Sequence, residues 1–563
     1  MVDSCAAEFA AVTPYYYSTY EGGGAESGVD YVPGLASSVK QRIAVVGSGP
    51  IRIGQGIEFD YGCVHAAGAI QDLGHEAIII NNNPETVSTD FDTSDRLYFD
   101  PLTLESVSEV LLREDANGIL LQFGGQTAIN LALPLSNEMP HLSSMGLDLV
   151  MEGTSPESVD EASDRERFEE FALRCGLRMP DGATATSPEG VRQAANEIGY
   201  PVLIRPSYVL GGRGMEILSN YKQLESYMRD AYLTSDRPLL IDKYLGNAME
   251  LDVDAVCDGE DVLVGAIMEH LEEAGIHSGD STCFIPPQNV PDKILEQVEE
   301  WTRVIGLELG IRGCFNIQFA IHDDLLYVLE VNPRGSRTFP FVAKSTGIPL
   351  ARIAARVALG ERLSELDIPE AQTEAVCVKA PVFPFIKLRG LDPAPGPEMK
   401  STGEVMGSHL RASAAYLKAR LATELPVPTQ GGVYITVKDE DKHPIIPLAE
   451  KLQEMGFVIY ATRGTSRVLR GVGGLEVKTC YRIAEGRSPD ALDLMRQGKI
   501  QLIINTPRSS GGAVLDGNMM RRLAVELNIP FVTTLAGARM EVEAVKEATN
   551  GTPEPRLLNI KSL

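Results

Sequence analysis

The stretch Phe315-Asn-Ile-Gln-Phe-Ala-Ile321, followed by Asp323-Asp324 and then by Leu326-Tyr-Val-Leu-Glu-Val-Asn332, decides how this chain is interpreted. The first part alternates as a strand does, the aspartates mark a turn, and the last part reads as a returning strand. Glu330 and Asn332 are two residues apart, so both side chains are expected on one face of their strand. The pattern predicts a β-hairpin with polar side chains on one face.

Gln318 shares that face only if it lies directly across from Glu330. Such a pairing requires a connection with an odd number of residues, most simply 323–325, because a two-residue turn would put Gln318 on the wrong face. Leu329 and Val331 are expected on the opposite, apolar face.

Oxygen ligands from glutamine, glutamate and asparagine suit Mg²⁺ or Mn²⁺. Gln318, Glu330 and Asn332 are therefore the candidate metal ligands, for ions that bridge ATP phosphates. The alternative interpretation is that Glu330 is a solvated strand residue.

A phosphate-binding pattern precedes the hairpin in the chain. Arg205-Pro-Ser207 follows the apolar run 200–204, and Gly211-Gly-Arg-Gly214 comes shortly after. Glycines let backbone N–H groups approach phosphate oxygens, and arginines add charge. The chain contains no GxxxxGK[ST] motif, so we expect a device different from the P-loop.

The N-terminal third alternates apolar runs with helical stretches, which indicates a parallel α/β sheet. Its first strand leads into Gly47-Ser-Gly49, but the next glycine, Gly54, comes too late for a GxGxxG fingerprint. The second strand leads into Asn81-Asn-Asn83 rather than into an acidic residue that would hold a ribose. The pattern therefore argues against NAD binding and favours a tight turn with close helix–strand packing.

Composition shifts divide the chain further. Residues 1–40 read as a tail without helical or strand period, and the segment from Glu424 to Gly432 reads as a linker rich in proline and glycine. We expect a tail at 1–40, an α/β domain at 41–150, an α+β domain at 151–385, a connecting segment at 386–425 and a last α/β unit at 426–563.

Charge excludes some partners. The 563 residues include 50 Lys and Arg against 78 Asp and Glu, a formal net charge of -28. Such a surface repels nucleic acids and anionic membranes, so neither is an expected partner. Only 16 of the basic residues are lysines, which favours a salt-adapted acidic surface over a merely soluble one.

The sequence carries no targeting pattern. It has no apolar run of about 18 residues and no basic-then-apolar N-terminus, so we expect no transmembrane helix and no secretory signal. The eight cysteines are scattered, with no CxxC pair. A reducing cytoplasm is the expected setting.

Three strings resemble a known family: 54–61 (GQGIEFDY), 83–90 (NPETVSTD) and 124–127 (GGQT). They are similar to the domain that precedes the ATP-grasp fold in carbamoyl-phosphate synthetases, and the hairpin resembles the ATP-grasp superfamily. The resemblance covers nearly the whole chain and fits the C-terminal half of the large subunit. It implies a Rossmann-like pre-ATP-grasp domain, an ATP-grasp fold that holds ATP between antiparallel sheets, and an α/β regulatory domain similar to methylglyoxal synthase.

The resemblance also implies site residues, position by position. The matches to ATP phosphates, adenine, ribose and the loop that reaches the nucleotide are Arg165, Arg205, Gly211, Gly212, Lys243, Leu245, Glu250, Gly275, Ile276, His277 and Ser278. Gln318, Glu330 and Asn332 match metal ligands for two ions, Arg334 and Arg337 match arginines beside the transferred phosphoryl group and carbamate, and Glu58, Glu85 and Glu404 match carboxylates of a carbamate path. His277 could act as a base, but we expect it to donate or accept hydrogen bonds that position the nucleotide, because carbamate is already a nucleophile.

The last α/β unit resembles the family's regulatory domain. Matches to its nucleotide-monophosphate site are Thr436, Lys442, Thr462, Thr465, Arg482 and Asn505. A threonine at a helix start also caps it, which is the plain alternative for Thr462. Ala380 stands where ornithine-activated members have an acidic residue, although Glu272, Asp280 and Thr534 match that site, so UMP inhibition is the expected control.

The resemblance implies phosphorylation of carbamate by ATP with Mg²⁺ or Mn²⁺, and it is compatible with a K⁺ ion. The partners implied are the N-terminal synthetase half and a glutaminase small subunit, in pyrimidine and arginine biosynthesis. Two alternatives remain open: another ATP-grasp ligase, and a regulatory module that binds UMP without catalysis.

Overall fold

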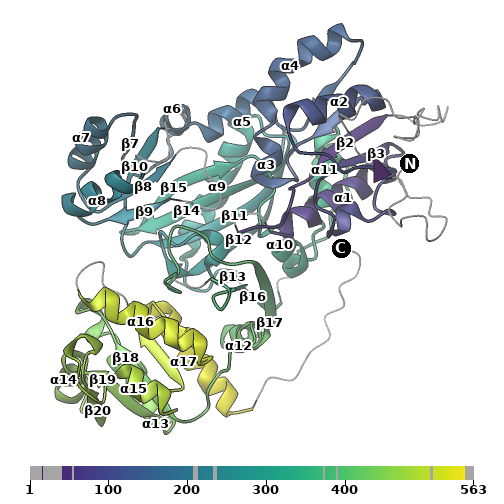
Figure 1. Ribbon diagram of the computed structural model, residues 1–563. Coiled ribbons are helices and arrows are strands. Elements are labelled where there is room, and N and C mark those ends of the chain that lie inside the picture. Colours follow the sequence, from purple (N-terminus) through teal and green to yellow (C-terminus); the bar gives the residue numbers. More distant parts are fainter. Residues whose placement is uncertain are drawn as a thin grey trace, which may run out of the picture.

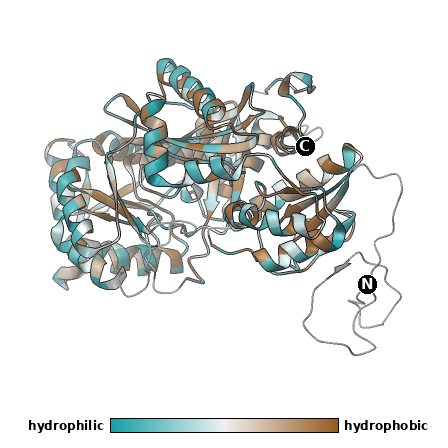
Figure 2. Ribbon diagram, turned by 90° about the horizontal axis from the view of Figure 1, so that it is seen from above, coloured by the Kyte–Doolittle hydropathy of each residue, from teal (hydrophilic) through white to brown (hydrophobic). Residues whose placement is uncertain are grey.

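The computed structural model describes residues 15–16, 41–53, 56–206, 214–231, 238–371, 374–388, 391–506 and 512–551. Within these ranges the strands form four sheets, and the C-terminal sheet with its helices lies apart from the other three (Figure 1). Hydrophobic residues occur in both strands and helices, and the helices also carry many hydrophilic residues (Figure 2), as expected for layered α/β packing.

The first sheet is parallel throughout, as the sequence predicts, with the order β1-β4-β3-β2-β5-β6. Its strands are β1 (Tyr15–Tyr16), β2 (Arg42–Val46), β3 (Glu76–Ile80), β4 (Arg96–Tyr98), β5 (Gly118–Leu120) and β6 (Val150–Glu152). Its helices are α1 (Glu58–Asp72), α2 (Leu104–Glu114), α3 (Gly125–Ile129), α4 (Ala132–Ser144) and α5 (Pro156–Ser163), with η1 (Val87–Thr89).

β1 corrects one expectation about the tail. Residues 1–40 were expected to lack strand structure, yet Tyr15 and Tyr16 pair in parallel with Leu97 and Tyr98 of β4. An edge strand offers unpaired backbone groups that such a short segment can use. The remainder of 1–40 lies outside the described residues.

A small antiparallel sheet of order β7-β10-β8-β9 follows. Its elements are β7 (Gly182–Ala185), α7 (Pro188–Ile198), β8 (Val202–Pro206), β9 (Glu216–Leu218), α8 (Tyr221–Ala231) and β10 (Leu239–Lys243), preceded by α6 (Arg165–Arg174). Each strand of this sheet is short, and α7 and α8 cover its apolar side with Val191 and Leu224.

The largest sheet is antiparallel, with the order β15-β14-β11-β12-β13-β16-β17. Its strands are β11 (Met249–Cys257), β12 (Val262–Glu273), β13 (Cys283–Ile285), β14 (Gly313–His322), β15 (Leu325–Asn332), β16 (Val376–Val382) and β17 (Gly403–His409). The helices around it are α9 (Asp292–Glu308), α10 (Phe339–Thr346), α11 (Leu350–Ala358) and α12 (Ala412–Ala422), with η2 (Ser278–Asp280) and η3 (Leu363–Glu365).

One face of this sheet packs on α9. Val298 and Ile305 of the helix are fully buried against Phe315 and Phe319 of β14, and the Trp301 ring lies 6.4 Å from that of Phe319. Full burial of each such side chain contributes roughly 1.5–3 kcal/mol. The opposite face of β14 and β15 is therefore free to carry polar side chains.

The hairpin differs from the sequence expectation in one respect. Gln318 pairs with Glu330 as expected, but the connection is the two-residue turn Asp323-Asp324, not an odd loop. A β-bulge at Leu329 restores the register, because it places one extra residue between Val328 and Glu330. Leu329 consequently lines the same pocket as Glu330, which corrects its expected place on the opposite face.

The C-terminal sheet is parallel, of order β20-β19-β18-β21-β22, and lies in the α/β unit that the sequence predicts. Its strands are β18 (Gly432–Thr436), β19 (Val458–Thr462), β20 (Val477–Cys480), β21 (Leu502–Asn505) and β22 (Phe531–Val532). Its helices are α13 (Ile446–Glu454), α14 (Arg463–Gly471), α15 (Ala491–Arg496), α16 (Gly512–Glu526) and α17 (Leu535–Thr549), with η4 (Glu440–Lys442) and η5 (Ile483–Glu485).

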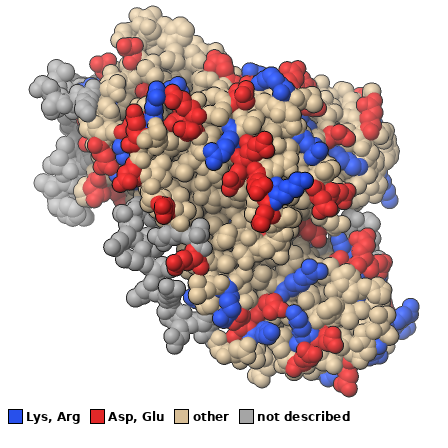
Figure 3. All heavy atoms as spheres, turned by 180° about the vertical axis from the view of Figure 1, so that it is seen from behind, with Lys and Arg blue, Asp and Glu red and all other residues tan. Residues whose placement is uncertain are grey.

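The surface carries acidic and basic side chains side by side (Figure 3). Among the helices in the described ranges, none has both the length and the apolar character needed to cross a bilayer.

Candidate active site

A pocket of about 350 Å³ lies between the small sheet and the largest one. Every sequence-predicted nucleotide, metal and catalytic residue that the structure describes lines it: Arg165, Arg205, Lys243, Leu245, Glu250, Gly275, Ile276, His277, Ser278, Gln318, Glu330, Asn332, Arg334 and Arg337. Gly211 and Gly212 lie outside the described residues. Residues that are spread over the chain from 165 to 337 thus line one pocket.

Strand pairing builds the polar floor of the pocket. Asp252 of β11, Gln318 of β14 and Glu330 of β15 form one row across three strands. Asn332 stands in the next row and donates from Nδ2 to Glu330 Oε1 at 3.0 Å. This carboxylate with neighbouring amide oxygens matches the donors that Mg²⁺ and Mn²⁺ prefer, so the residues fit the expected ions.

Arginines face this floor. Arg205 Nη1 donates to Glu330 Oε2 at 3.3 Å, and Arg334 Nη2 donates to Asn332 Oδ1 at 3.1 Å. Arg165 is held by Asp242, 3.1 Å from its Nε. Guanidinium groups placed around an acidic floor can hold phosphate oxygens and screen their charge.

The other end of the pocket is apolar. Leu245, Ala320 and Leu329 pack together there, and Glu250 Oε1 accepts from the Gly275 N–H at 3.0 Å. Lys243 Nζ donates to the Gly199 carbonyl at 2.8 Å. An apolar slot with a few polar groups suits a nucleobase and its sugar.

The loop of residues 275–281 closes one side. His277 Nδ1 accepts from the Gly279 N–H at 3.0 Å, and the His277 N–H donates to the Gly396 carbonyl at 2.9 Å. Burial lowers the pKa of His277, so the ring is neutral at pH 7. Ser278 Oγ accepts from Gln318 Nε2 at 3.0 Å, which ties the loop to the floor.

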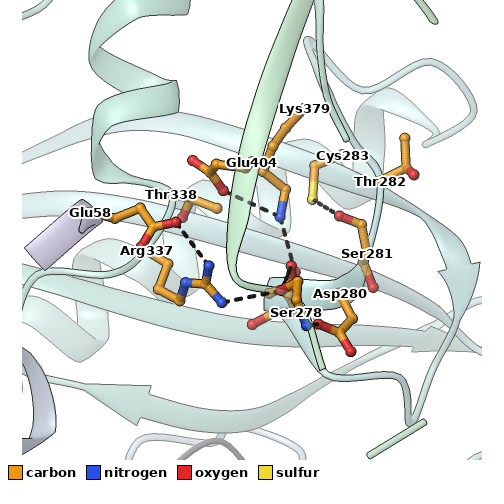
Figure 4. A network of polar contacts seen from close by, with 12 residues as sticks. Glu58, Ser278, Asp280, Ser281, Thr282, Cys283, Arg337, Thr338, Lys379 and Glu404 are labelled. Carbon is orange, nitrogen blue, oxygen red and sulfur yellow. Dashed lines mark hydrogen bonds and ion pairs between the residues drawn. The ribbon is translucent and has the colours of Figure 1, made fainter. Parts of the chain in front are cut away.

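A buried charge network extends from the pocket toward the first sheet (Figure 4). Arg337 Nη2 donates to Glu58 Oε1 at 2.8 Å, and Lys379 Nζ lies 3.8 Å from Glu404 Oε2. Burial raises the pKa of Glu404 to about 7, with Lys379 opposing and Glu58 adding to the rise. The structure thus brings Glu58 and Glu404 together, while Glu85 is exposed on the loop after β3.

Sequence reasoning missed two buried charged residues close to this site. Lys379 is fully buried and donates to the Ser278 carbonyl at 3.2 Å; a lysine inside the apolar strand β16 was the available signal. Asp254, also fully buried, accepts from Thr338 Oγ1 at 2.6 Å and from Ser336 Oγ at 2.8 Å. Burial raises the pKa of Asp254 to about 6.

The predicted regulatory residues gather at the carboxyl edge of the C-terminal sheet. Thr436 and Asn505 are paired neighbours on β18 and β21, and Thr462 and Thr465 stand at the start of α14. The Lys442 ammonium lies beside Gly464 of the same helix. Arg482 follows β20, where its Nε donates to Asp516 at 3.3 Å.

Family models of known proteins match three parts of the chain. Residues 39–161 match the carbamoyl phosphate synthase preATP-grasp domain, 164–366 the carbamoyl-phosphate synthase L chain ATP binding domain, and 444–533 the MGS-like domain. A carbamoyl phosphate synthase large chain, C-terminal section, from Methanocaldococcus jannaschii is 49% identical over 98% of this chain and 89% of its own length. The chain belongs to the carbamoyl phosphate synthase large-chain family. The resemblance and the fold class predicted from the sequence are thereby confirmed.

Other members of the carbamoyl phosphate synthase large-chain family are longer. The large chain of Methanothrix thermoacetophila is 51% identical over 100% of this chain but over 51% of its own length. The chain thus spans about half the length of the curated relatives it matches first. Membership places the chain among the ATP-grasp ligases.

Solved structures show the same fold at low identity. The biotin carboxylase domain of the Hydrogenobacter thermophilus 2-oxoglutarate carboxylase, in complex with MgADP and bicarbonate, aligns with a TM-score of 0.53 at 18% identity, over 68% of this chain and 89% of that one. An ADP complex of N5-carboxyaminoimidazole ribonucleotide synthetase aligns with a TM-score of 0.51 at 11% identity, over 69% and 97%. These likenesses establish the ATP-grasp fold of the family.

Proposed function

We propose that this chain transfers the γ-phosphoryl group of ATP to carbamate, giving carbamoyl phosphate and ADP. The observation that carries the proposal is a pocket in which the acidic and amide side chains of β14 and β15 lie together with Arg205, Arg334 and Arg337. Transfer between two anions needs positioning and charge neutralisation more than covalent catalysis. The pocket provides both.

In the proposed reaction a carbamate oxygen forms a bond to the γ-phosphorus while the bond to the ADP oxygen breaks. Arg165 and Arg205 hold ATP phosphates, and Arg334 and Arg337 hold the phosphoryl group and the carbamate anion. Gln318, Glu330 and Asn332 would hold two Mg²⁺ or Mn²⁺ ions, which supply positive charge to the phosphate oxygens when bound. Neutral His277 accepts or donates hydrogen bonds and takes no proton from carbamate.

Residues outside the pocket have proposed roles as well. Glu58 and Glu404 line the route of carbamate toward Arg337, with Glu85 at its outer end. A K⁺ ion, with which the family resemblance is compatible, would add monovalent charge near the nucleotide. The described cysteines are all free, which supports the reducing cytoplasm as the compartment.

Carbamate must come from elsewhere, because the chain covers about half of its longer relatives. We infer that a separate N-terminal synthetase half supplies it, with a glutaminase subunit supplying ammonia, for pyrimidine and arginine biosynthesis. Ile57, which precedes α1, and Val87 and Phe91, in and after η1, are exposed, and they offer apolar contacts for that partner.

The test measures ATP formation from ADP and carbamoyl phosphate in the presence of Mg²⁺. A coupled enzyme assay detects the ATP as it forms. The native chain alone should form ATP, and the rate should fall when Mg²⁺ is chelated. The assay should run from low to molar KCl because the surface is strongly acidic. A folded chain that binds ADP but forms no ATP at any salt concentration would defeat the proposal.

We also propose that the C-terminal unit binds a nucleotide monophosphate such as UMP and controls the pocket. Arg521 connects the nucleotide site to the rest of the molecule. Its Nη1 donates to Asn505 Oδ1, and its Nε and Nη2 donate to the two carboxylate oxygens of Asp392. Asp392 lies near the start of the segment 391–401. This segment contacts the active-site loop, where the His277 N–H donates to the Gly396 carbonyl. The same segment ends on Asp280, which accepts from the Ser401 N–H at 2.9 Å.

This chain of contacts supports regulation of the pocket from a distance. A ligand that engages Asn505 competes with Arg521 for its amide, so it can change the hold of Arg521 on Asp392. The segment 391–401 then transmits the change to His277 and to Arg337, whose Nη1 lies 3.5 Å from Ser401 Oγ.

A further inference from the structure

Gln122 lies outside the pocket lining but is bound to the base of the hairpin. It follows β5 of the first sheet, and its side chain is buried, with 2% of the residue exposed. Its Nε2 donates to the Pro333 carbonyl at 3.1 Å, to the Cys314 carbonyl at 3.4 Å and to Thr154 Oγ1 at 2.9 Å. Cys314 lies near the start of β14, and Pro333 directly follows Asn332 at the end of β15.

Backbone contacts strengthen this tie. The Gly335 N–H donates to the Gln122 carbonyl at 2.8 Å. Pro333 and Gly335 are the two neighbours of Arg334 in the chain. Gln122 therefore holds the backbone on both sides of Arg334. Helix α3, which follows Gln122, contacts Arg334 itself, because Gln126 Oε1 accepts from Arg334 Nε at 3.2 Å.

Two glycines pack tightly against the side-chain amide of Gln122. Gly153 and Gly313 have φ angles of 92° and 102°, and a Cβ on either would lie 2.5 Å or 2.4 Å from Gln122 Oε1. Those angles and the missing space both demand glycine. The amide is held in one orientation because its Nε2 faces three acceptors: Thr154 Oγ1 and the two carbonyls at the hairpin ends, Pro333 and Cys314.

We propose that Gln122 is a positioning residue for phosphoryl transfer. By fixing the Cys314 and Pro333 carbonyls, it sets where the metal-ligand row and Arg334 stand relative to the nucleotide. The inference rests on the proposed function of the pocket, which it deepens by assigning a task to the first sheet. Loss of these bonds moves the ends of both strands, and a displacement of about 1 Å at a reacting centre costs on the order of 100-fold in rate.

Gln122→Met tests this, because methionine keeps the length of the side chain and removes its N–H donors. The first readout is ADP binding by calorimetry at increasing Mg²⁺, which needs no turnover. We expect the half-saturating Mg²⁺ concentration to rise by roughly tenfold while ADP binding without Mg²⁺ changes little. The second readout is ATP formation, in which we expect kcat to fall by about 10- to 100-fold with a small change in the KM for ADP.

Thr154→Ala is the matched control. It removes one acceptor of Gln122 and the Thr154 contacts to Arg312, but it leaves the Pro333 carbonyl in place. We expect a loss of thermal stability without the rise in Mg²⁺ demand. If Gln122→Met fails to fold, Gln122→Asn retains the amide on a side chain one methylene shorter and should show the same Mg²⁺ effect.

The outcomes separate this inference from the proposed function. A native chain that binds MgADP but forms no ATP defeats the proposed reaction, while the Mg²⁺ dependence still decides the role of Gln122. A folded Gln122→Met protein with native Mg²⁺ dependence, or with changes equal to those of Thr154→Ala, would overturn the positioning role.

Discussion

Glu330 is the only carboxylate among the three proposed metal ligands. Glu330→Gln keeps the shape of the side chain and removes its charge, so ATP formation should fall by about 100-fold or more. The coupled assay measures this, with circular dichroism to confirm the fold. Glu260→Gln is the control, since Glu260 forms an exposed ion pair with Arg362. Native activity in Glu330→Gln would contradict the metal role.

Asp254 makes stability depend on pH. Burial raises its pKa from 3.8 to about 6. Between these two pH values the folded chain keeps a proton on Asp254 that the unfolded chain has released. The contribution of Asp254 to the free energy of unfolding is therefore full below about pH 4 and is lost as the pH rises through about 6.

Asp254→Asn does not titrate and should remove this dependence. The free energy of unfolding of the native chain, minus that of the variant, should fall by roughly 2–3 kcal/mol between about pH 4 and pH 7. Urea titrations across this range measure the difference, and exposed Asp148→Asn should run parallel to the native chain. A difference that stays level would show that the pKa of Asp254 is not raised.

At the scale of elements, the β14–β15 hairpin shows what sequence can and cannot predict. Gln318 does pair with Glu330, as the candidate metal site requires, but the odd loop expected to produce this pairing is absent and a bulge at Leu329 takes its place. The bulge at Leu329 could not be predicted, because the run 325–329 is apolar or aromatic throughout and carries no glycine to mark an extra residue. The two-residue turn was missed because Asp323-Asp324 lacks the usual Asn-Gly signal.

The turn offers a stability test. Asp323 and Asp324 have φ angles of 49° and 59°, a region that glycine occupies more readily than aspartate. Asp324→Gly should raise the free energy of unfolding by about 0.5–1 kcal/mol and leave ATP formation unchanged. Urea titration gives the value. Asp148→Gly, at an exposed position without positive φ, should give no gain; equal effects at both sites would rule out relief of strain.

At the scale of the whole molecule, the segment 391–401 connects the C-terminal unit to the pocket. Asp392→Asn weakens the contact with Arg521 but leaves the proposed nucleotide site intact. We expect UMP to raise the thermal midpoint of this variant as it does for the native chain, because binding stabilises the folded state by mass action. The effect of UMP on ATP formation should be lost.

Asp72→Asn is the control for that experiment, since Asp72 pairs with Arg352 far from the C-terminal unit. It should keep both responses to UMP. A full UMP effect on the rate in Asp392→Asn would show that the signal takes another route, and no stabilisation of any variant would exclude UMP as the ligand.

The fold class and the family resemblance could be predicted at this scale, because apolar alternation and unusual strings identify them. The hydrogen bonds between residues that are distant in the sequence could not be predicted. Gln122 with Pro333, and Arg521 with Asp392, are residues far apart in the chain whose meeting depends on how the sheets pack. A single sequence holds no local pattern for such a pair.

The single tryptophan of the chain lies where it can serve as an optical reporter. Trp301 packs on Phe319, and Phe319 is the neighbour of Gln318 along β14. Its emission therefore comes from one indole on the reverse side of the strand that lines the pocket. Ligand titrations on the native chain and on each variant can be followed by intrinsic fluorescence, without a dye and without altering another residue.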